Sequence, residues 1–309
     1  MSRPARPALP ARAGVAPSTV VTPHVSAGHY ASLLDFLAER FPFVDRLQWQ
    51  QRLQDGLVLD DSGAPLSAQQ PFEGGLRLHY YRSLGPETPI PFEETVLFQD
   101  EQLVVADKPH FLPVVPSGGY LQETLLLRLR RRLGLTTLVP LHRIDRDTAG
   151  LVLFSVQPAS RGAYQSLFRA RAVHKTYQAV ARWDPTLPWP LRRETRIGNG
   201  THFMQQAELA GMPNTLTDIR PLEVGGAWAR YELQPLTGHR HQLRVHMNAL
   251  GLPIRGDGIY PVLTPAGHTD FSQPLQLLAH SLAFLDPLSG TPRHFKSARS
   301  LLPLPEDLA

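Results

Sequence analysis

The sequence predicts an α+β protein whose larger domain is built on a mixed, largely antiparallel β-sheet. Two observations lead to this class. Runs rich in valine, leucine and aromatic residues indicate strands, and segments with leucines three and four residues apart indicate helices. The two kinds do not alternate strictly along the chain, whereas a parallel βαβ sheet requires alternation. The length of 309 residues is sufficient for two domains.

Three segments are expected before the larger domain. Residues 1–28 contain five prolines and no hydrophobic periodicity, which predicts a disordered tail. Residues 29–82 predict a small α/β domain, with helices at 33–41 and 44–53 and strands at 56–59 and 76–81. This order of elements resembles the small RNA-binding domain of the ribosomal S-four type. Residues 83–95 contain three prolines and three acidic residues and predict a linker.

Residues 96–309 predict the larger domain. Its expected elements are strands at 96–98 and 103–105, a helix at 121–133, a strand at 151–156, a helix at 159–171, strands at 177–183 and 228–233, and a helix at 239–250. Both helices between residues 121 and 171 end in arginine.

The composition excludes several function classes. Without any cysteine the chain has no disulfide framework, thiolate metal site, iron–sulfur cluster or cysteine nucleophile. No apolar run approaches the roughly 18 to 20 residues that a membrane span needs, so we expect no membrane partner. The glycine-rich phosphate loop, the hydrolase nucleophile elbow and the zinc-protease motif are also missing from the sequence.

The net charge of +4 is unevenly distributed. Residues 31–107 carry five arginines against thirteen acidic residues, whereas 121–183 carry eleven basic residues against three acidic ones. A basic, arginine-dominated region suits a phosphate-rich partner, and we expect the basic helix ends to border an RNA groove. A GC-rich genome would also produce an arginine bias, so charge alone does not identify the partner.

The first candidate site is the segment 141–150, Leu-His-Arg-Ile-Asp-Arg-Asp-Thr-Ala-Gly, which leads into a predicted strand. Asp145 and Asp147 alternate there with Arg143 and Arg146. A carboxylate held by guanidinium groups stays ionised and can act as a nucleophile or base. A polar turn whose aspartates only bond backbone N–H groups would have the same composition.

The second candidate, 237–246, contains three histidines that suggest a metal site: His239, His241 and His246. Arg240 and Arg244 are expected on one helical face, and no carboxylate lies nearby in sequence, so a metal is disfavoured. Phosphate or carboxylate suits this segment better. In the third candidate, 174–180, Tyr177 is either an ordinary strand aromatic or a ring that stacks on a base.

Together and in this order, these segments resemble the motifs of the RluA-type family of RNA pseudouridine synthases. The matches are Asp-Lys-Pro at 107–109, His-Arg-Leu-Asp-x-x-Thr-Ser-Gly at 142–150, Lys-x-Tyr at 175–177, Gly-Arg-x-His-Gln-Leu-Arg-Val-His at 238–246 and Gly-x-Pro-Ile-x-Gly-Asp-x-x-Tyr at 251–260. The resemblance extends from about residue 96 to 290. The sequence departs from the family at Ile144 and Ala149, at His239, where the family usually has arginine, and at 277–280.

The resemblance implies that Asp145 is the catalytic carboxylate and that Tyr177 and Arg244 act with it. Arg244 would pair with Asp145 and orient it. Tyr177 would stack on the extracted uracil and is a candidate to assist proton removal from carbon 5. Arg143 would fill the gap left by the flipped base, and Leu243 would form part of the apolar pocket.

The resemblance also implies RNA as partner, ribosomal or transfer RNA, and a reaction that needs neither metal nor cofactor. The uridine would be flipped out of its stack, which costs a few kcal/mol. Further motif residues are implied in binding the RNA: His142, Lys175, Arg240, His241 and Gln242. We expect a cytoplasmic monomer.

Two rival functions stay open. One is a non-catalytic RNA-binding or ribosome-assembly protein, against which the presence of Asp145, Tyr177 and Arg244 argues. The other is a two-carboxylate glycoside hydrolase that uses Asp145 and Asp147. No second acid recurs in the other motifs, which argues against this function.

Overall fold

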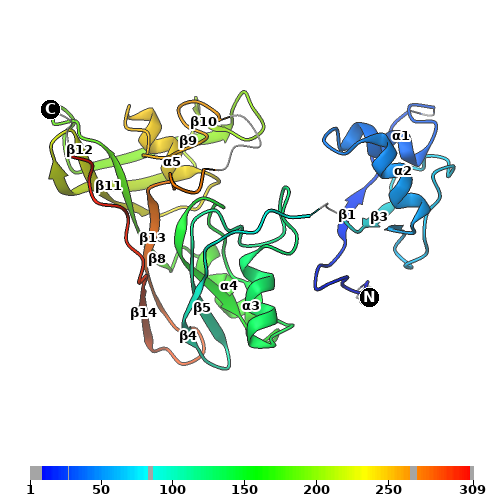
Figure 1. The fold of residues 1–309 in the computed structure, drawn as a ribbon, viewed down its shortest axis with the longest axis horizontal. Coiled ribbons are helices and arrows are strands. Elements are labelled where there is room, and N and C mark those ends of the chain that lie inside the picture. The colour runs from blue at the N-terminus through cyan, green and yellow to red at the C-terminus, as the bar shows by residue number, and fades with distance from the viewer. Residues whose placement is uncertain (1–8, 27, 83–85, 265–269, 307–309) are drawn as a thin grey trace. The chain divides into compact units, whose positions relative to one another are not determined.

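The structure is a computed structural model, and it describes residues 9–26, 28–82, 86–264 and 270–306. Two compact units consist of Met1–Glu87 with Gly118–Gln122, and of Thr88–Ser117 with Glu123–Ala309 (Figure 1). That residues 29–82 and residues 96–309 are separate functional domains stays a prediction. The first three residues of the predicted linker, 83–85, lie outside the described residues.

The first unit combines two helices with a small antiparallel sheet of order β1–β3–β2. Its elements are β1 (Ser18–Val21), α1 (Leu33–Arg40), α2 (Arg46–Gln54), β2 (Val58–Leu59) and β3 (Arg77–Tyr80). Ser32 caps α1, because its hydroxyl accepts the N–H of Asp35 while its own N–H donates to the Asp35 carboxylate. Phe36, Leu37 and Trp49 form the centre of the apolar core. The likeness of this unit to the S-four domain stays a prediction.

Strand β1 lies inside the segment that the proline content predicts to be a disordered tail. It pairs with β3 from Ser18 opposite Tyr80 to Val21 opposite Arg77. The physical reason is the β-branched run that starts at Thr19, which favours a strand despite the prolines on either side. Residues 1–8 and 27 of the predicted tail lie outside the described residues.

The second unit is built on one eleven-stranded sheet. Its strands are β4 (Thr95–Gln99), β5 (Leu103–Lys108), β6 (Val139–Pro140), β7 (Ala149–Ser155), β8 (His174–Arg182), β9 (Leu191–Asn199), β10 (Gln206–Leu209), β11 (Thr215–Gly225), β12 (Trp228–Pro235), β13 (Leu277–Leu285) and β14 (Pro292–Lys296). The order is β10–β9–β11–β12–β8–β13–β7–β5–β4, with β14 beside β13 and β6 beside β7. Among the described strands only β7 and β13 pair in parallel, so the predicted mixed, largely antiparallel sheet is confirmed.

Three helices accompany this sheet: α3 (Leu125–Leu133), α4 (Arg161–Arg169) and α5 (Gln242–Ala249). Helix α3 begins after Thr124, whose hydroxyl accepts the N–H of Leu127, and ends at Gly134 in the left-handed conformation. Helix α5 begins later than predicted, because His241 takes a left-handed conformation with φ of 58°. Arg240 therefore precedes the helix, and the expectation that it shares a helical face with Arg244 is wrong.

Strand β7 enters the sheet between β5 and β13 at Gly150. This residue has φ of +109°, and a Cβ atom there would lie 2.2 Å from the carbonyl oxygen of Ala279. Only glycine fits such a close approach of two backbones. The turn before β7, which carries the Asp145 motif, is therefore anchored at the middle of the sheet.

Candidate active site

The backbone of the Asp145 turn is held by the last residue of β5, Lys108, and by His110, which follows the strand. The ammonium of Lys108, which is fully buried, donates to the carbonyls of Pro109 at 2.9 Å and Arg146 at 2.8 Å. Nδ1 of His110 donates to the carbonyl of Asp147 at 2.7 Å. Burial lowers the pKa of Lys108 from its usual value near 10.5 to about 7. The Asp-Lys-Pro motif thus positions the turn.

The two oxygen atoms of the Asp145 carboxylate have different surroundings. Oδ2 accepts a hydrogen bond from Nη1 of Arg244 at 3.1 Å, and Nε2 of His241 lies 3.9 Å from the same oxygen. Among the residues that the structure describes, none donates to Oδ1. The Asp145 side chain is 27% exposed. One oxygen is therefore oriented by the protein, and the other is available to a bound molecule.

Arg244, on α5, joins Asp145 to a second carboxylate. Its Nε and Nη2 donate to Asp257 at 2.8 and 2.6 Å, and Oδ1 of Asp257 also accepts the N–H groups of Ile259 and Tyr260. Both side chains are almost fully buried. Burial opposes the charge of the guanidinium, but the bonds and charge of Asp257, with those of Asp145, raise the pKa of Arg244. Asp257 thus fixes the plane of the Arg244 guanidinium group, which faces Asp145.

Tyr177, on β8, packs against the apolar cluster that contains Leu243 of α5. Burial raises the pKa of the Tyr177 phenol well above its usual value, and the negative charge of Asp145 raises it further. The phenol therefore keeps its proton at neutral pH. Tyr177, Leu243, Arg244 and Asp145 come together, although they lie on three separate sequence motifs.

His241 directly precedes α5 and is nearly buried. Its Nδ1 lies 3.1 Å from the hydroxyl of Tyr260, which also donates to the carbonyl of Gln206 and accepts its N–H. Burial lowers the pKa of His241 to about 4. The imidazole is therefore neutral at pH 7, and it links strand β10 to the Asp145 carboxylate.

Two further residues of the second motif hold α5 on the sheet. Oε1 of Gln242 accepts from the Thr237 hydroxyl at 2.8 Å, and its Nε2 donates to the Thr217 hydroxyl at 2.9 Å. The buried ring of His246 bonds three threonine hydroxyls through its two nitrogens, those of Thr195, Thr215 and Thr217. These bonds saturate both side chains, so Gln242 and His246 position α5 and leave no polar atom of the imidazole for a ligand.

The side chain of His142 makes its contacts inside the protein. Its Nε2 accepts the N–H of Leu153 at 3.1 Å, its ring stacks on Phe168 at 4.9 Å, and burial lowers its pKa to about 3. The ammonium of Lys175 donates to the carbonyl of Thr237 at 3.1 Å. Both residues therefore join the motif segments to their neighbours.

Two arginines of the motifs differ in their surroundings. The guanidinium of Arg240 donates to the carbonyls of Phe203 and Met204 at 3.1 and 3.0 Å, which ties the β9–β10 turn to the start of α5. The side chain of Arg143 is exposed, and no bond joins it to another residue in the described part of the chain. Both arginines are exposed, but Arg240 is bonded to the protein, whereas Arg143 is not, within the described residues.

Comparisons with known proteins identify this arrangement. The family described as RNA pseudouridylate synthase matches residues 102–249. An uncharacterized RNA pseudouridine synthase of Synechocystis is 31% identical, over 74% of this chain and 79% of its own length. The ribosomal large subunit pseudouridine synthase D of Xanthomonas campestris is 30% identical, over 93% and 89%. The dual-specificity RNA pseudouridine synthase RluA of Yersinia pestis is 33% identical, over 65% and 97%.

The chain belongs to the RluA-type family of RNA pseudouridine synthases. It is therefore an isomerase that converts uridine to pseudouridine in RNA. Among solved structures, human RNA pseudouridylate synthase domain containing 1 has a TM-score of 0.56 at 23% identity, covering 69% of this chain and 86% of its own, and shares the fold. Human RNA pseudouridylate synthase domain containing 4 has a TM-score of 0.52 at 26% identity, covering 67% and 88%.

Sequence reasoning did not single out three residues that the synthase places around Asp145. They are Lys108, Asp257 and Tyr260. Each lies inside a segment that matches a family motif, so the signal was present at 107–109 and 251–260. Their functions depend on contacts with distant residues, and no local pattern shows such contacts.

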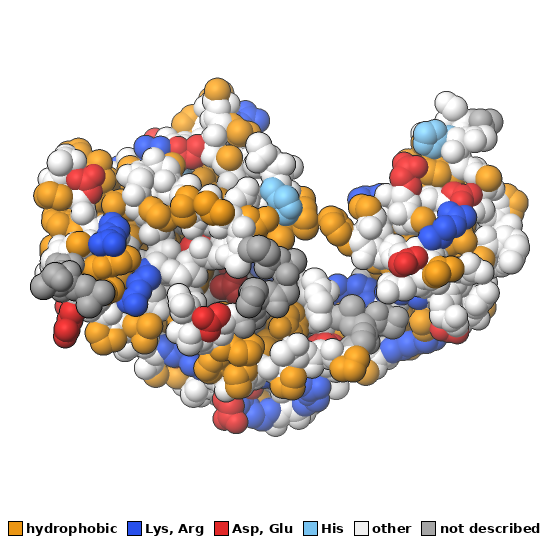
Figure 2. Space-filling model, turned by 45° about the horizontal axis from the view of Figure 1, so that its top comes forward, with side chains coloured by type: hydrophobic (Ala, Val, Ile, Leu, Met, Phe, Trp, Pro, Cys, Tyr) orange, Lys and Arg blue, Asp and Glu red, His pale blue; other side chains and the backbone are white. Residues whose placement is uncertain are grey.

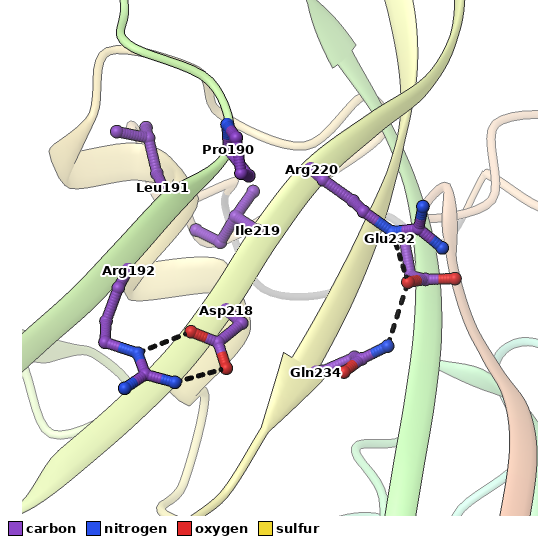
Figure 3. Close-up of a pocket in the computed structure, with 8 residues that line it drawn as sticks. All are labelled: Pro190, Leu191, Arg192, Asp218, Ile219, Arg220, Glu232 and Gln234. Atoms are coloured by element: carbon purple, nitrogen blue, oxygen red, sulfur yellow. Dashed lines mark hydrogen bonds and ion pairs between the residues drawn. The ribbon is translucent and has the colours of Figure 1, made fainter.

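A shallow pocket of the synthase lies elsewhere, on β9, β11 and β12 (Figure 3). Arg192 pairs there with Asp218 at 2.7 Å, and Arg220 pairs with Glu232 at 2.7 Å. Gln234 also donates to Glu232 at 2.9 Å. Each carboxylate of this pocket is therefore already bound to an arginine, unlike Oδ1 of Asp145.

Within the described residues, no group of three or more histidine, aspartate or glutamate side chains is arranged to hold a metal ion. No helix in the same part of the chain is long and apolar enough to cross a membrane.

Proposed function

We propose that Asp145 is the reacting carboxylate of a synthase that isomerises specific uridines in structured ribosomal or transfer RNA. The single observation that supports it most is the asymmetry of this carboxylate: Arg244 orients Oδ2 at 3.1 Å, while no described residue bonds Oδ1. The reaction needs one such oxygen directed at the ribose or the base. Relatives named as a ribosomal large subunit synthase, a transfer RNA synthase and a dual-specificity RNA synthase support this range of substrates.

The reaction exchanges the bond from N1 of uracil to C1′ of ribose for a bond from C5 to C1′. Bond exchange of this kind is favoured when the reacting groups are held in place, since orientation can supply several kcal/mol of the barrier. The buried Asp257–Arg244–Asp145 series provides such orientation, because Arg244 is held in one plane by Asp257. The apolar side chain of Leu243 then forms a wall beside the base.

The target uridine must leave its stack before a carboxylate at the bottom of a turn can reach it. In the proposed complex the exposed Arg143 occupies the gap in the RNA, since a planar cation stacks on bases and binds phosphate. The ring of Tyr177 stacks on the extracted uracil. Its protonated phenol supports stacking and hydrogen-bond donation at neutral pH.

The test is incubation of the protein with bulk ribosomal RNA and transfer RNA, followed by nucleoside analysis for pseudouridine and for released uracil. The wild type should form pseudouridine, and Asp145→Asn should lower the rate about 10⁴-fold or more. RNA binding by this variant should stay close to that of the wild type.

Asp147→Asn is the matched control, because Asp147 pairs with its neighbour Arg146 at 2.8 Å and is not directed at Arg244. It should retain pseudouridine formation. Turnover by Asp145→Asn would refute the assignment of the carboxylate. Release of uracil that depends on both aspartates would instead support a glycoside hydrolase.

A further inference from the structure

His241 has a backbone conformation that its place in the chain does not explain. With φ of 58° it lies in the left-handed region, which non-glycine residues adopt rarely and at a cost. Its side chain makes no capping bond to α5. The ring is instead directed between Tyr260 and Asp145, with 9% of the residue exposed. Strained residues of this kind cluster at functional sites.

The hydrogen bonds around Tyr260 assign the proton on the His241 ring. The Tyr260 hydroxyl has a single proton, which it donates to the carbonyl of Gln206 at 3.1 Å, while its oxygen accepts the Gln206 N–H at 2.7 Å. With the Tyr260 proton on the Gln206 carbonyl, Nδ1 of His241, 3.1 Å from the same hydroxyl, acts as the donor. A neutral imidazole has only one N–H group, so Nε2 retains a lone pair.

This lone pair faces the reacting carboxylate. Nε2 lies 3.9 Å from Oδ2 of Asp145, beyond hydrogen-bond distance. If Asp145 acts on the ribose, C1′ must approach its carboxylate to about 3–3.5 Å. Carbon 5 is bonded to C1′ when it loses its proton, by whichever route the bond forms. The breaking C5–H bond therefore lies in the space that Nε2 borders.

We propose that Nε2 of His241 accepts the proton that leaves carbon 5 of the uracil. The inference rests on the function proposed for Asp145. The electron pair of the C5–H bond forms the C5=C6 double bond, and the pair of the N1=C6 bond returns to N1. The imidazolium then transfers the proton to N1, which carries a proton in the product, and the neutral ring is restored. The negative charge of Asp145 stabilises the imidazolium in the interval.

Tyr177 is a second candidate to receive this proton. Burial and the Asp145 charge hold the pKa of its phenol far above the usual value, so it already carries its proton at neutral pH. A group must be unprotonated to accept a proton. His241 meets this condition because burial lowers its pKa to about 4.

The test uses an RNA substrate that contains uridine deuterated at carbon 5, with wild type and His241→Asn compared. Asparagine tolerates the left-handed conformation, and its amide can donate to Tyr260, but it has no atom at the position of Nε2. The variant should lower kcat about 10²- to 10⁴-fold with little change in KM. Its deuterium isotope effect on kcat should exceed that of the wild type, since loss of the C5 proton becomes the slow step.

His239→Asn is the matched control, since it changes an exposed histidine two residues earlier and should leave the isotope effect at the wild-type value. Circular dichroism of both variants checks the fold. Low activity of His241→Asn without a larger isotope effect would indicate a structural role and overturn the inference. An isotope effect that rises in Tyr177→Phe and not in His241→Asn would transfer the role to Tyr177. A wild type that forms no pseudouridine would overturn the proposed function itself.

Discussion

Arg128 on α3 and Arg244 on α5 are both mostly buried, and each contacts two carboxylates. Arg128 pairs with Glu94 and Glu123, and its other bonds go to main-chain carbonyls of the segment before β4. Arg244 pairs with Asp257 and directs its remaining nitrogen at Asp145, whose second oxygen no described residue bonds. The same chemistry thus stabilises structure in one region and orients a reactive group in the other.

This difference shows that charge density does not locate a site. Helix α3 has the densest run of arginines, yet Arg130 donates to the carbonyl of Leu138 and Arg132 pairs with Glu94. On the face shown in Figure 2, lysine and arginine side chains form separate groups, several of them beside acidic side chains. The prediction that the basic end of α3 borders an RNA groove stays untested, but three of its arginines are occupied by protein partners.

Among the variants that test the contrast between Arg128 and Arg244, Arg244→Lys should have the largest effect, a decrease in kcat. Lysine keeps the charge but lacks the planar fork that contacts Asp257 and Asp145 together. A displacement of the carboxylate by about 1 Å would lower kcat about 10²-fold. Single-turnover pseudouridine formation measures this step, and an unchanged rate would mean that the fork does not orient Asp145.

A smaller effect, on stability only, is expected for Arg128→Met. The change leaves the buried carboxylate of Glu94 with one cation fewer and removes bonds to main-chain carbonyls. Because the Arg128 side chain is 15% exposed, we expect a loss of about 2–3 kcal/mol in the free energy of unfolding. Urea unfolding measures it, and kcat should stay unchanged.

Arg143→Ala is the matched counterpart on the active-site side, since this arginine is exposed. It should change the free energy of unfolding by about 0.5 kcal/mol or less and should raise KM for RNA. If Arg128→Met raised KM instead, while Arg143→Ala did not, the contrast between the two regions would be wrong.

A further effect on stability is the response of the active-site region to acid. Burial lowers the pKa of His246 to about 4, below the unfolded value near 6.5. The unfolded chain therefore binds this proton first as the pH falls, and stability decreases from pH 6.5 towards 4. Between pH 7 and 5 this histidine should contribute at most about 2 kcal/mol.

Urea titrations at pH 7 and 5 measure that loss. The pH dependence should be smaller in His246→Gln and retained in Arg128→Met, because an arginine stays charged over this range. Equal pH dependence in the wild type and His246→Gln would show that the ring is not held neutral by burial.

Local patterns were informative where a residue's neighbours in sequence decide its conformation. The hydrophobic spacing located α1, α3 and α4, and α3 ends at Leu133 as predicted. The predicted start of α5 was wrong, because His241 has a left-handed conformation. That conformation goes with its contact to Tyr260, which hydrophobic periodicity does not indicate. For the same reason the sequence placed Arg240 on a helix, whereas it bonds the β9–β10 turn.

The sequence by itself determined the fold class, the order of the motifs and the family to which they belong. Only the tertiary structure decided which charged groups meet. Arg244 lies 99 residues from Asp145, and their contact depends on the sheet that places α5 beside the Asp145 turn. The physical reason is that a motif specifies the kind of side chain, whereas distance, burial and partner specify what that side chain does.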